Sequence, residues 1–188
     1  MRLIATLILF IFISCKKDVE LKPTNYKITF TLDSVLTQTG KNSLPYSNGF
    51  YYLKLDSTRF QTLSRITGKF LVNDKPNQSL EGNINWEASH YIVVNSGDTI
   101  SKIIKTYFNP YTGTLQKIQL PSLISQSQTL VSVVNGTSIP DFETGNINTM
   151  IGPVYKMKGD TITIIGTAKW FANNKLDSIK KSVRIICE

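Results

Sequence analysis

Hydrophobic and polar residues alternate along most of the chain after residue 23. In Tyr26–Leu32, for example, Tyr, Ile, Phe and Leu alternate with Lys and Thr. Later segments repeat this period of two, are rich in β-branched and aromatic residues, and are separated by Gly, Asn, Asp and Pro. This pattern is typical of half-buried β-strands joined by turns. We therefore predict one all-β domain over residues 24–188, an antiparallel β-sandwich of Ig-like or jelly-roll-like type, with a β-barrel as the alternative.

Two asparagine-containing pairs are the clearest turn signals in this pattern. Asn135-Gly136 lies between two short β-branched segments, and Asn-Gly supplies the positive φ angles that a type I′ hairpin turn requires. Asn173-Asn174 lies between the last two apolar segments and predicts a turn that joins the last two strands.

One stretch departs from the period of two and predicts a short helix. Phe60, Leu63 and Ile66 recur at helical spacing. Asp56 or Ser57 could cap the start of such a helix, and Gly68 its end, because these residue types are preferred at those positions. We expect at most this one short helix in the domain.

The tetrapeptide Gly-Asp-Thr-Ile occurs twice, as Gly97–Ile100 and as Gly159–Ile162. In both places an alternating segment ends, glycine supplies backbone angles open to few other residues, and a β-branched segment begins. We predict that each copy forms a hairpin tip. The flanking residues do not repeat, which argues against a duplicated domain.

The N-terminal residues have a different composition. Arg2 is followed by an apolar run from Leu3 to Ile13, then by Ser14 and Cys15. This run is shorter than the roughly 20 residues that span a hydrocarbon core, and it has the length of a secretory signal's apolar region. We therefore exclude it from the predicted domain.

The segment Phe12–Cys15 resembles the lipobox of bacterial lipoproteins, in particular those of Bacteroidetes-type bacteria. This resemblance implies a signal peptide over residues 1–14, cleavage before Cys15, and fatty-acyl chains on that cysteine. Residues 15–23 would then be a tether above a membrane, and the mature chain would have 188 − 14 = 174 residues. We expect a lipid-anchored protein of the cell envelope, at the outer membrane, with its periplasmic or outward orientation left open. The alternative is an ordinary secretory signal, or an apolar anchor with an incidental cysteine.

The chain is basic, with a formal net charge of +8. Its basic residues are scattered singly or in pairs, whereas nucleic-acid-binding proteins cluster them on one element. We therefore expect no nucleic-acid partner, and a basic surface close to anionic lipid headgroups.

Five of the eight aspartates are followed by Ser or Thr and then by Ile, Val or Thr. Chance predicts roughly 0.6 such matches, so the excess is real. The pattern resembles the O-glycosylation sequon of Bacteroidetes-type bacteria, although turns that lead into strands explain part of it. The resemblance implies glycans on the hydroxyl residues Ser34, Ser57, Thr99, Thr161 and Ser178.

Residues typical of catalytic and metal sites are scarce. His90 is the single histidine, and with Cys15 lipidated Cys187 is the single remaining thiol. No zinc-binding, phosphate-loop or calcium-loop motif occurs. We expect no cofactor and no metal, a structural role for His90, and a core position for Cys187.

Aromatic residues around one turn are the candidate ligand contacts: Tyr107, Phe108 and Tyr111, with a core position as the alternative. We predict a non-enzymatic, lipid-anchored module that binds a protein or glycan partner. One alternative is an envelope glycan hydrolase whose acidic site assembles in space. The other is a structural subunit of a surface assembly, which would show a long unpaired edge strand.

Overall fold

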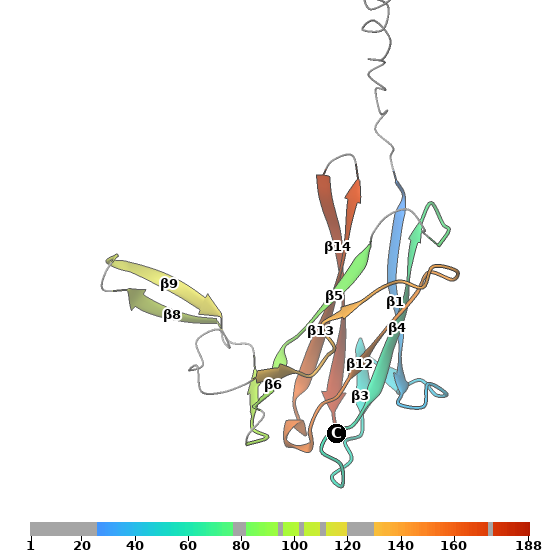
Figure 1. Ribbon diagram of the computed structural model, residues 1–188. Helices are drawn as coiled ribbons and strands as arrows, with labels where there is room; N and C mark the ends of the chain where they lie inside the picture. The colour runs from blue at the N-terminus through green and yellow to red at the C-terminus, as the bar shows by residue number, and fades with distance from the viewer. Residues whose placement is uncertain are drawn as a thin grey trace, which may run out of the picture.

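The fold is an all-β sandwich, and the long strands of its two large sheets run along a common long axis (Figure 1). The computed structural model describes residues 26–76, 82–93, 96–101, 104–109, 112–119, 130–172 and 175–188. One sheet has three antiparallel strands in the order β1-β4-β12. Its strands are β1 (Ile28–Thr37), β4 (Ser64–Val72) and β12 (Asn146–Ile151).

The second sheet has six strands in the order β11-β5-β13-β14-β3-β2. The long antiparallel hairpin β13–β14 forms its centre, and β5 pairs with the other edge of β13. Only β3 runs parallel to its neighbour β14. The strands are β2 (Tyr46–Ser47), β3 (Phe50–Leu53), β5 (Asn83–Ala88), β11 (Thr137–Ser138), β13 (Thr161–Ala172) and β14 (Lys175–Cys187).

Two smaller sheets complete the described part of the chain, in which no sheet closes into a barrel. No α-helix occurs in that part, so no described helix has the length and apolar character needed to cross a bilayer. The helical content is one 3-10 turn, η1 (Tyr155–Met157). The remaining strands are β6 (His90–Val93), β7 (Thr99–Ser101), β8 (Ile104–Asn109), β9 (Thr114–Gln119) and β10 (Leu130–Ser132).

The core lies between the two large sheets, and strand β4 shows why they pack together. Along β4, every second residue from Ser64 to Val72 is buried. The inner face of the opposite sheet is equally apolar, because Ile162, Ile164 and Trp170 of β13 are all buried. Period-two burial on both sheets is what the alternating sequence predicts for a sandwich.

The predicted helix over Asp56–Gly68 is wrong. A turn follows Asp56, and β4 begins at Ser64. Phe60, which would have anchored the helix, is 67 % exposed. The helical spacing is a coincidence of three residues, whereas the period of two continues through Ile66 and beyond and is stabilised by burial against the opposite sheet.

The predicted type I′ turn at Asn135-Gly136 is also wrong. Neither residue has a positive φ, and the strands on either side, β10 and β11, pair with different neighbours, β6 and β5. Val133 and Val134 are both buried, so the chain here passes through the core instead of forming a half-exposed hairpin arm. The prediction of a turn between the last two strands is confirmed by the pairing of Ala172 with Lys175, although its residues 173–174 lie outside the described residues.

The two Gly-Asp-Thr-Ile copies have the same glycine conformation, but only one of them connects two paired strands. Gly97 and Gly159 both have positive φ, of 63° and 92°, and a strand begins two residues later. The first copy is the predicted hairpin tip, because β6 and β7 pair antiparallel across it. The second is not a hairpin tip. It follows η1, and the amide of Gly159 donates to the carbonyl of Cys187 at the end of β14. The buried Met157 holds η1 in place, so a 3-10 turn stands where the prediction required a strand.

Candidate functional site

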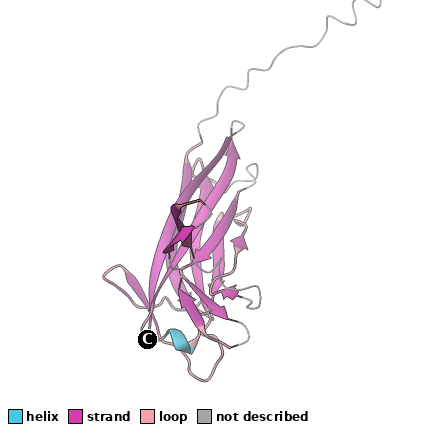
Figure 2. Cartoon of the chain, turned by 90° about the vertical axis from the view of Figure 1, so that its left-hand side faces the viewer, coloured by secondary structure: helices cyan, strands magenta, loops and turns pink. Residues whose placement is uncertain are grey.

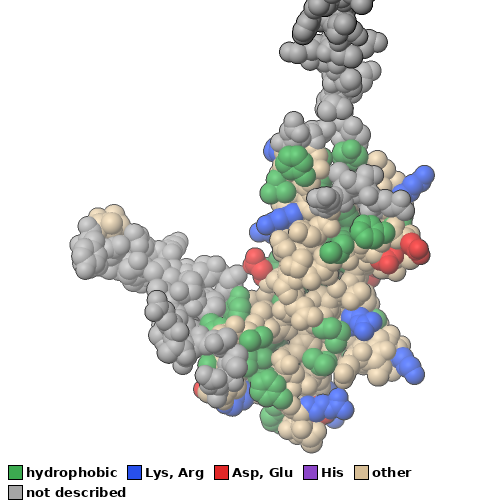
Figure 3. Space-filling model, in the orientation of Figure 1, with side chains coloured by type: hydrophobic (Ala, Val, Ile, Leu, Met, Phe, Trp, Pro, Cys, Tyr) green, Lys and Arg blue, Asp and Glu red, His purple; other side chains and the backbone are tan. Residues whose placement is uncertain are grey.

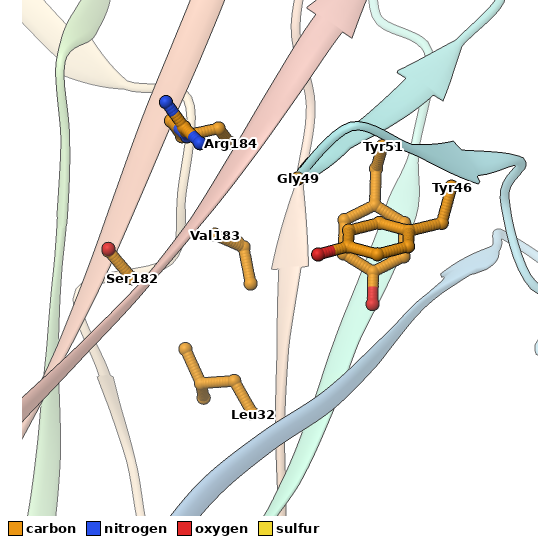
Figure 4. A pocket seen from close by; sticks show the side chains of 7 residues that line it. All are labelled: Leu32, Tyr46, Gly49, Tyr51, Ser182, Val183 and Arg184. Atoms are coloured by element: carbon orange, nitrogen blue, oxygen red, sulfur yellow. The ribbon is translucent and has the colours of Figure 1, made fainter.

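A candidate site in the described part of the chain is a pocket at the seam between the two large sheets. Its volume is about 410 Å³, and residues of β1, the β2–β3 hairpin and β14 line it. Figure 4 shows the side chains of β1 and β14 on one side of this space and the two tyrosine rings of the hairpin on the other. We call it the seam pocket. It is lined by Leu32, Tyr46, Gly49, Tyr51, Ser182, Val183 and Arg184.

The pocket exists because β3 leaves β14 early. The two strands pair only where Tyr51–Leu53 lie beside Ile185–Cys187. Beyond that point the chain turns away at the hairpin, and among the described strands none pairs with β14 along Lys175–Arg184 on this edge. We call Lys175–Arg184 the free edge. The seam pocket lies where the free edge begins.

The hairpin that shapes the pocket has a type I′ turn at Asn48-Gly49. Both residues have positive φ, of 52° and 82°, and Ser47 pairs with Phe50 across them. This is the geometry for which Asn-Gly is preferred in two-residue hairpin loops. The turn places Tyr46 directly opposite Tyr51, so both rings lie on one side of the hairpin.

The two tyrosine rings form the aromatic wall of the pocket. Their centroids are 4.7 Å apart and the rings are tilted by 49°. Tyr46 is 62 % exposed, so one face of its ring is open to a ligand. The Tyr51 hydroxyl donates to the carbonyl oxygen of Asp33 at 3.5 Å and links the two sheets. Burial, and then the charges of Tyr46 and Asp33, raise the pKa of Tyr51, so the hydroxyl keeps its proton at neutral pH.

Arg184 supplies the positive charge of the site. Its guanidinium lies over the ring of Phe50, 4.1 Å from the centroid, which restricts its orientation. A Cβ on Gly49 would stand 3.0 Å from Nη2 of Arg184, so glycine makes room for the guanidinium. Within the described residues Arg184 has no ion-pair partner. Its N–H donors are therefore held in position and available to a carboxylate or another acceptor.

Carboxylates do not line the pocket, and the described residues contain no group of three or more His, Cys, Asp or Glu side chains that could hold a metal ion. Three aspartates do have lowered pKa values. Hydrogen bonds lower them, from Thr58 to Asp56, from Lys156 to Asp98 and from Thr144 to Asp141, and all three carboxylates lie outside the pocket. The seam pocket thus offers aromatic, apolar and cationic contacts for binding, without an acid–base pair.

His90 lies elsewhere, in a small polar network. The Ser89 hydroxyl accepts from the amide of Thr163 at 2.9 Å and lies 2.8 Å from Nδ1 of His90. The other ring nitrogen of His90, Nε2, lies 3.8 Å from the carboxylate of Asp160. Burial lowers the pKa of His90, and the charge of Asp160 opposes that shift. This network connects β5, β6 and β13, a structural role that agrees with the sequence-based expectation.

Cys187 is buried in the core at the end of β14, on the same face as the buried Val183 and Ile185. Burial, assisted by the charge of Asp160, raises the pKa of its thiol to about 12. The thiol therefore stays protonated and packs as a small apolar side chain.

Of the three aromatic residues predicted as ligand contacts, two lie in strands that the structure describes. Tyr107 and Phe108 lie in β8, opposite Gln116 and Leu115 of β9. Tyr111 lies outside the described residues, as does Cys15 with residues 1–25.

The five candidate glycosylation residues differ in accessibility. Ser57, Thr161 and Ser178 are exposed, whereas Thr99 is half-buried. Ser34 is half-buried as well, and its hydroxyl is 2.8 Å from the hydroxyl of Thr67. Three of the five hydroxyls are therefore open to an enzyme in the folded protein.

The residues that form the pocket were not predicted from the sequence, although a signal was present. Asn48-Gly49 is an Asn-Gly pair with aromatic residues on both sides, which is a strong hairpin signal. It would have placed Tyr46 opposite Tyr51. No sequence signal connects Arg184 to Phe50, because 134 residues (184 − 50) separate them and only the parallel β14–β3 pairing brings them together.

Comparisons with known proteins leave the family open. No protein-family model matches the chain, and no curated protein is similar to it. Among solved structures, the chain is similar to AggA, the major subunit of aggregative adherence fimbriae type I from Escherichia coli, at 7 % identity and a TM-score of 0.34, over 88 % of this chain and 97 % of that one. It is also similar to a family 123 glycoside hydrolase from Clostridium perfringens, at 13 % identity and a TM-score of 0.24, over 88 % of this chain but 28 % of that one. At these values neither match assigns an activity or a partner to this chain.

Proposed function

We propose that the protein is a lipid-anchored, non-enzymatic interaction module of the bacterial cell envelope, and that it binds its partner at the seam pocket and along the adjoining free edge. The lipobox-like segment ending at Cys15 supports the anchor. The observation that carries the binding function is the combination of an unpaired, stacked Arg184 with the exposed ring of Tyr46 at the start of the free edge.

The free edge favours a protein partner over a glycan partner. Its unpaired backbone N–H and C=O groups can pair with an extended segment of another chain, which is how β-strand addition works. Tyrosine and arginine are also the residues that contribute most to protein–protein interfaces. Lys181 on the edge limits unspecific pairing by repulsion, and it favours an acidic partner segment.

A structural subunit of a surface assembly is the second candidate function, because the same free edge is what such a subunit would present to its neighbour. The alternative of a glycan hydrolase has no comparable support, since the seam pocket contains no carboxylate.

The binding function is tested by capture from envelope extracts of the native host. The bait is the full-length protein, compared with a double variant, Tyr46→Ala with Arg184→Gln. We expect the wild type to retain one partner and the double variant to bind it about tenfold or more weakly. Tyr155→Ala is the matched control, because Tyr155 is also an exposed tyrosine but lies in η1, outside the pocket. Equal capture by the double variant and the wild type would rule out the seam pocket as the binding site.

A further inference from the structure

The tip of the β13–β14 hairpin carries an exposed apolar pair. Phe171 and Leu176 lie directly opposite each other in the strand register. They are 57 % and 61 % exposed, although they are large apolar side chains next to a well-formed core. Paired apolar side chains at a solvent-exposed tip add nothing to the core, so they are available to an external surface.

Lysines surround this pair on the hairpin. Lys169 is exposed and two residues before Phe171, so it lies on the same face of the sheet. Lys180 lies on that face too, because it is four residues after Leu176. Lys175 is exposed at the start of β14, and it lies on the opposite face because it directly precedes Leu176. These three lysines have no ion-pair partner among the described residues, and the sole acidic residue of the two strands is Asp177.

The tip lies at the end of the sandwich from which β1 starts. Figures 1 and 2, seen from directions 90° apart, both show the start of β1 and the β13–β14 tip at one end. The 3-10 turn η1, which contains Tyr155, lies at the other end in Figure 2. Figure 3 shows hydrophobic and basic side chains together at the end that carries the tip.

The proposed lipid anchor turns this end toward a membrane. Cys15 precedes Ile28, the first residue of β1, by 28 − 15 = 13 residues, which span about 45 Å at most when fully extended. The domain therefore stays close to the bilayer, and the end with the N-terminal strand is the end tethered to it. The exposed apolar pair and its lysines are at that same end.

We infer that the β13–β14 tip docks on an anionic phospholipid surface. Phe171 and Leu176 enter the interfacial region of the bilayer, and Lys169, Lys175 and Lys180 contact its headgroups. An apolar tip with lysines on both of its faces matches the two components of such binding, burial of apolar area and attraction to anionic lipids. A second copy of the chain is a poorer occupant, because it would bring the same lysines together. This inference rests on the proposed lipid anchor.

Docking at the tip has a consequence for the binding site. Arg184 lies eight positions after Leu176 in β14 (184 − 176), which corresponds to about 26 Å along the strand. The seam pocket would therefore stand clear of the headgroups, with the free edge between it and the membrane.

A tryptophan placed at the tip tests the inference. The variant Phe171→Trp is purified with its native anchor and reconstituted into vesicles of phosphatidylglycerol and phosphatidylcholine, with or without brominated acyl chains. Trp86 and Trp170 are buried, so the wild type measured in the same vesicles supplies the background. Tyr155→Trp is the control at the opposite end. We expect the emission of Phe171→Trp to shift to shorter wavelength and to be quenched by brominated lipid, and that of Tyr155→Trp to do neither.

The charge requirement is tested in the same vesicles. Adding Lys169→Glu and Lys180→Glu to Phe171→Trp removes most of the quenching, and vesicles of phosphatidylcholine alone have the same effect. Unchanged quenching in either case overturns the role of anionic lipid. A blue shift that requires an envelope protein instead of lipid would identify the tip as a protein contact, and would overturn the inference.

Flotation of the vesicles distinguishes a failure of the proposed lipid anchor from a failure of the docked tip. If the protein does not float with the vesicles, the lipid anchor is wrong, and the inference fails with it. If the protein floats but Phe171→Trp behaves like Tyr155→Trp, the anchor stands and the docked tip is wrong.

Discussion

Arg184 is a cation that the fold holds in place without neutralising it. The Phe50 ring lies beneath its guanidinium, and Gly49 leaves the space beside Nη2 that any side chain would fill. Most surface arginines lose considerable side-chain entropy when they bind a partner. The stacking on Phe50 reduces that loss, so Arg184 is the residue whose removal should weaken binding most.

Gly49→Ala tests how far this arrangement depends on one glycine. The left-handed backbone at Gly49, with φ of 82°, is unfavourable for alanine, and the new Cβ would contact Arg184. We expect a loss of about 1–2 kcal/mol in the free energy of unfolding, measured by denaturant titration. Gly136→Ala is the matched control, because Gly136 lacks a positive φ and a Cβ there would meet no atom within 4 Å. Equal losses in the two variants would contradict this role for Gly49.

His90 predicts a pH dependence of stability. Burial lowers its pKa below the ordinary value of 6.5, so the unfolded chain binds the proton more tightly than the folded protein. The contribution of neutral His90 to stability is therefore complete above pH 6.5. It decreases as the pH falls from 6.5 toward the lower pKa of the folded state.

Thermal unfolding of His90→Gln between pH 5 and 7.5 tests this sign. We expect the wild type to lose stability below pH about 6.5 and the variant to lose less of it. Asp160→Asn removes the charge that supports protonated His90, so its loss below pH 6.5 should be larger than that of the wild type. A wild type that becomes more stable on acidification over this range would show the opposite sign.

Strands and turns were predictable where a local sequence pattern is compatible with only one kind of secondary structure. The alternation in β1, and the turn signal between β13 and β14, lead directly to the observed elements. At Asn135-Gly136 the expected positive φ is absent, and β10 and β11 on its two sides belong to different sheets. At the second Gly-Asp-Thr-Ile copy, Gly159 has a positive φ, but a 3-10 turn precedes it instead of a strand. Which segments pair depends on long-range packing that local patterns do not contain.

Glycosylation at the ends of strands gives an element-level prediction. In protein purified from the native host, we expect intact mass above that of the acylated polypeptide, and peptide mapping should place the added mass first on Ser57, Thr161 and Ser178. These hydroxyls are exposed, whereas Ser34 is engaged with Thr67. Asp160→Glu breaks the sequon at Thr161, so it should remove that glycan and leave the one at Ser57. An unmodified wild-type mass would end the hypothesis.

At the scale of the whole molecule, our proposals place membrane docking and partner binding at different positions along the long axis of the sandwich. The end that carries the β13–β14 tip faces the membrane in our proposal, and the seam pocket lies further along β14. The sequence predicted an all-β sandwich correctly, because alternation and turn spacing report the fold class. It could not predict the seam pocket, since that pocket depends on how far β3 pairs with β14.

Membrane attachment through Cys15 is the whole-molecule prediction. We expect Cys15→Ser to release the protein from the membrane fraction of the native host, or to leave it with its signal peptide attached. Ser43→Ala, which leaves the N-terminal segment and the seam pocket intact, is the control and should fractionate as the wild type does. Co-sedimentation of Cys15→Ser with membranes at the wild-type level and mature size would exclude the lipid anchor.

The central claim is that a partner binds at the seam pocket, and site-specific photo-crosslinking in cells tests it most directly. A photoreactive phenylalanine analogue replaces Tyr46 in one strain and Tyr155 in another, in the otherwise native full-length protein. We expect a discrete crosslinked adduct from position 46 that is absent from position 155 and weakened by Arg184→Gln. No adduct from position 46, or the same adduct from both positions, would contradict binding at the seam pocket.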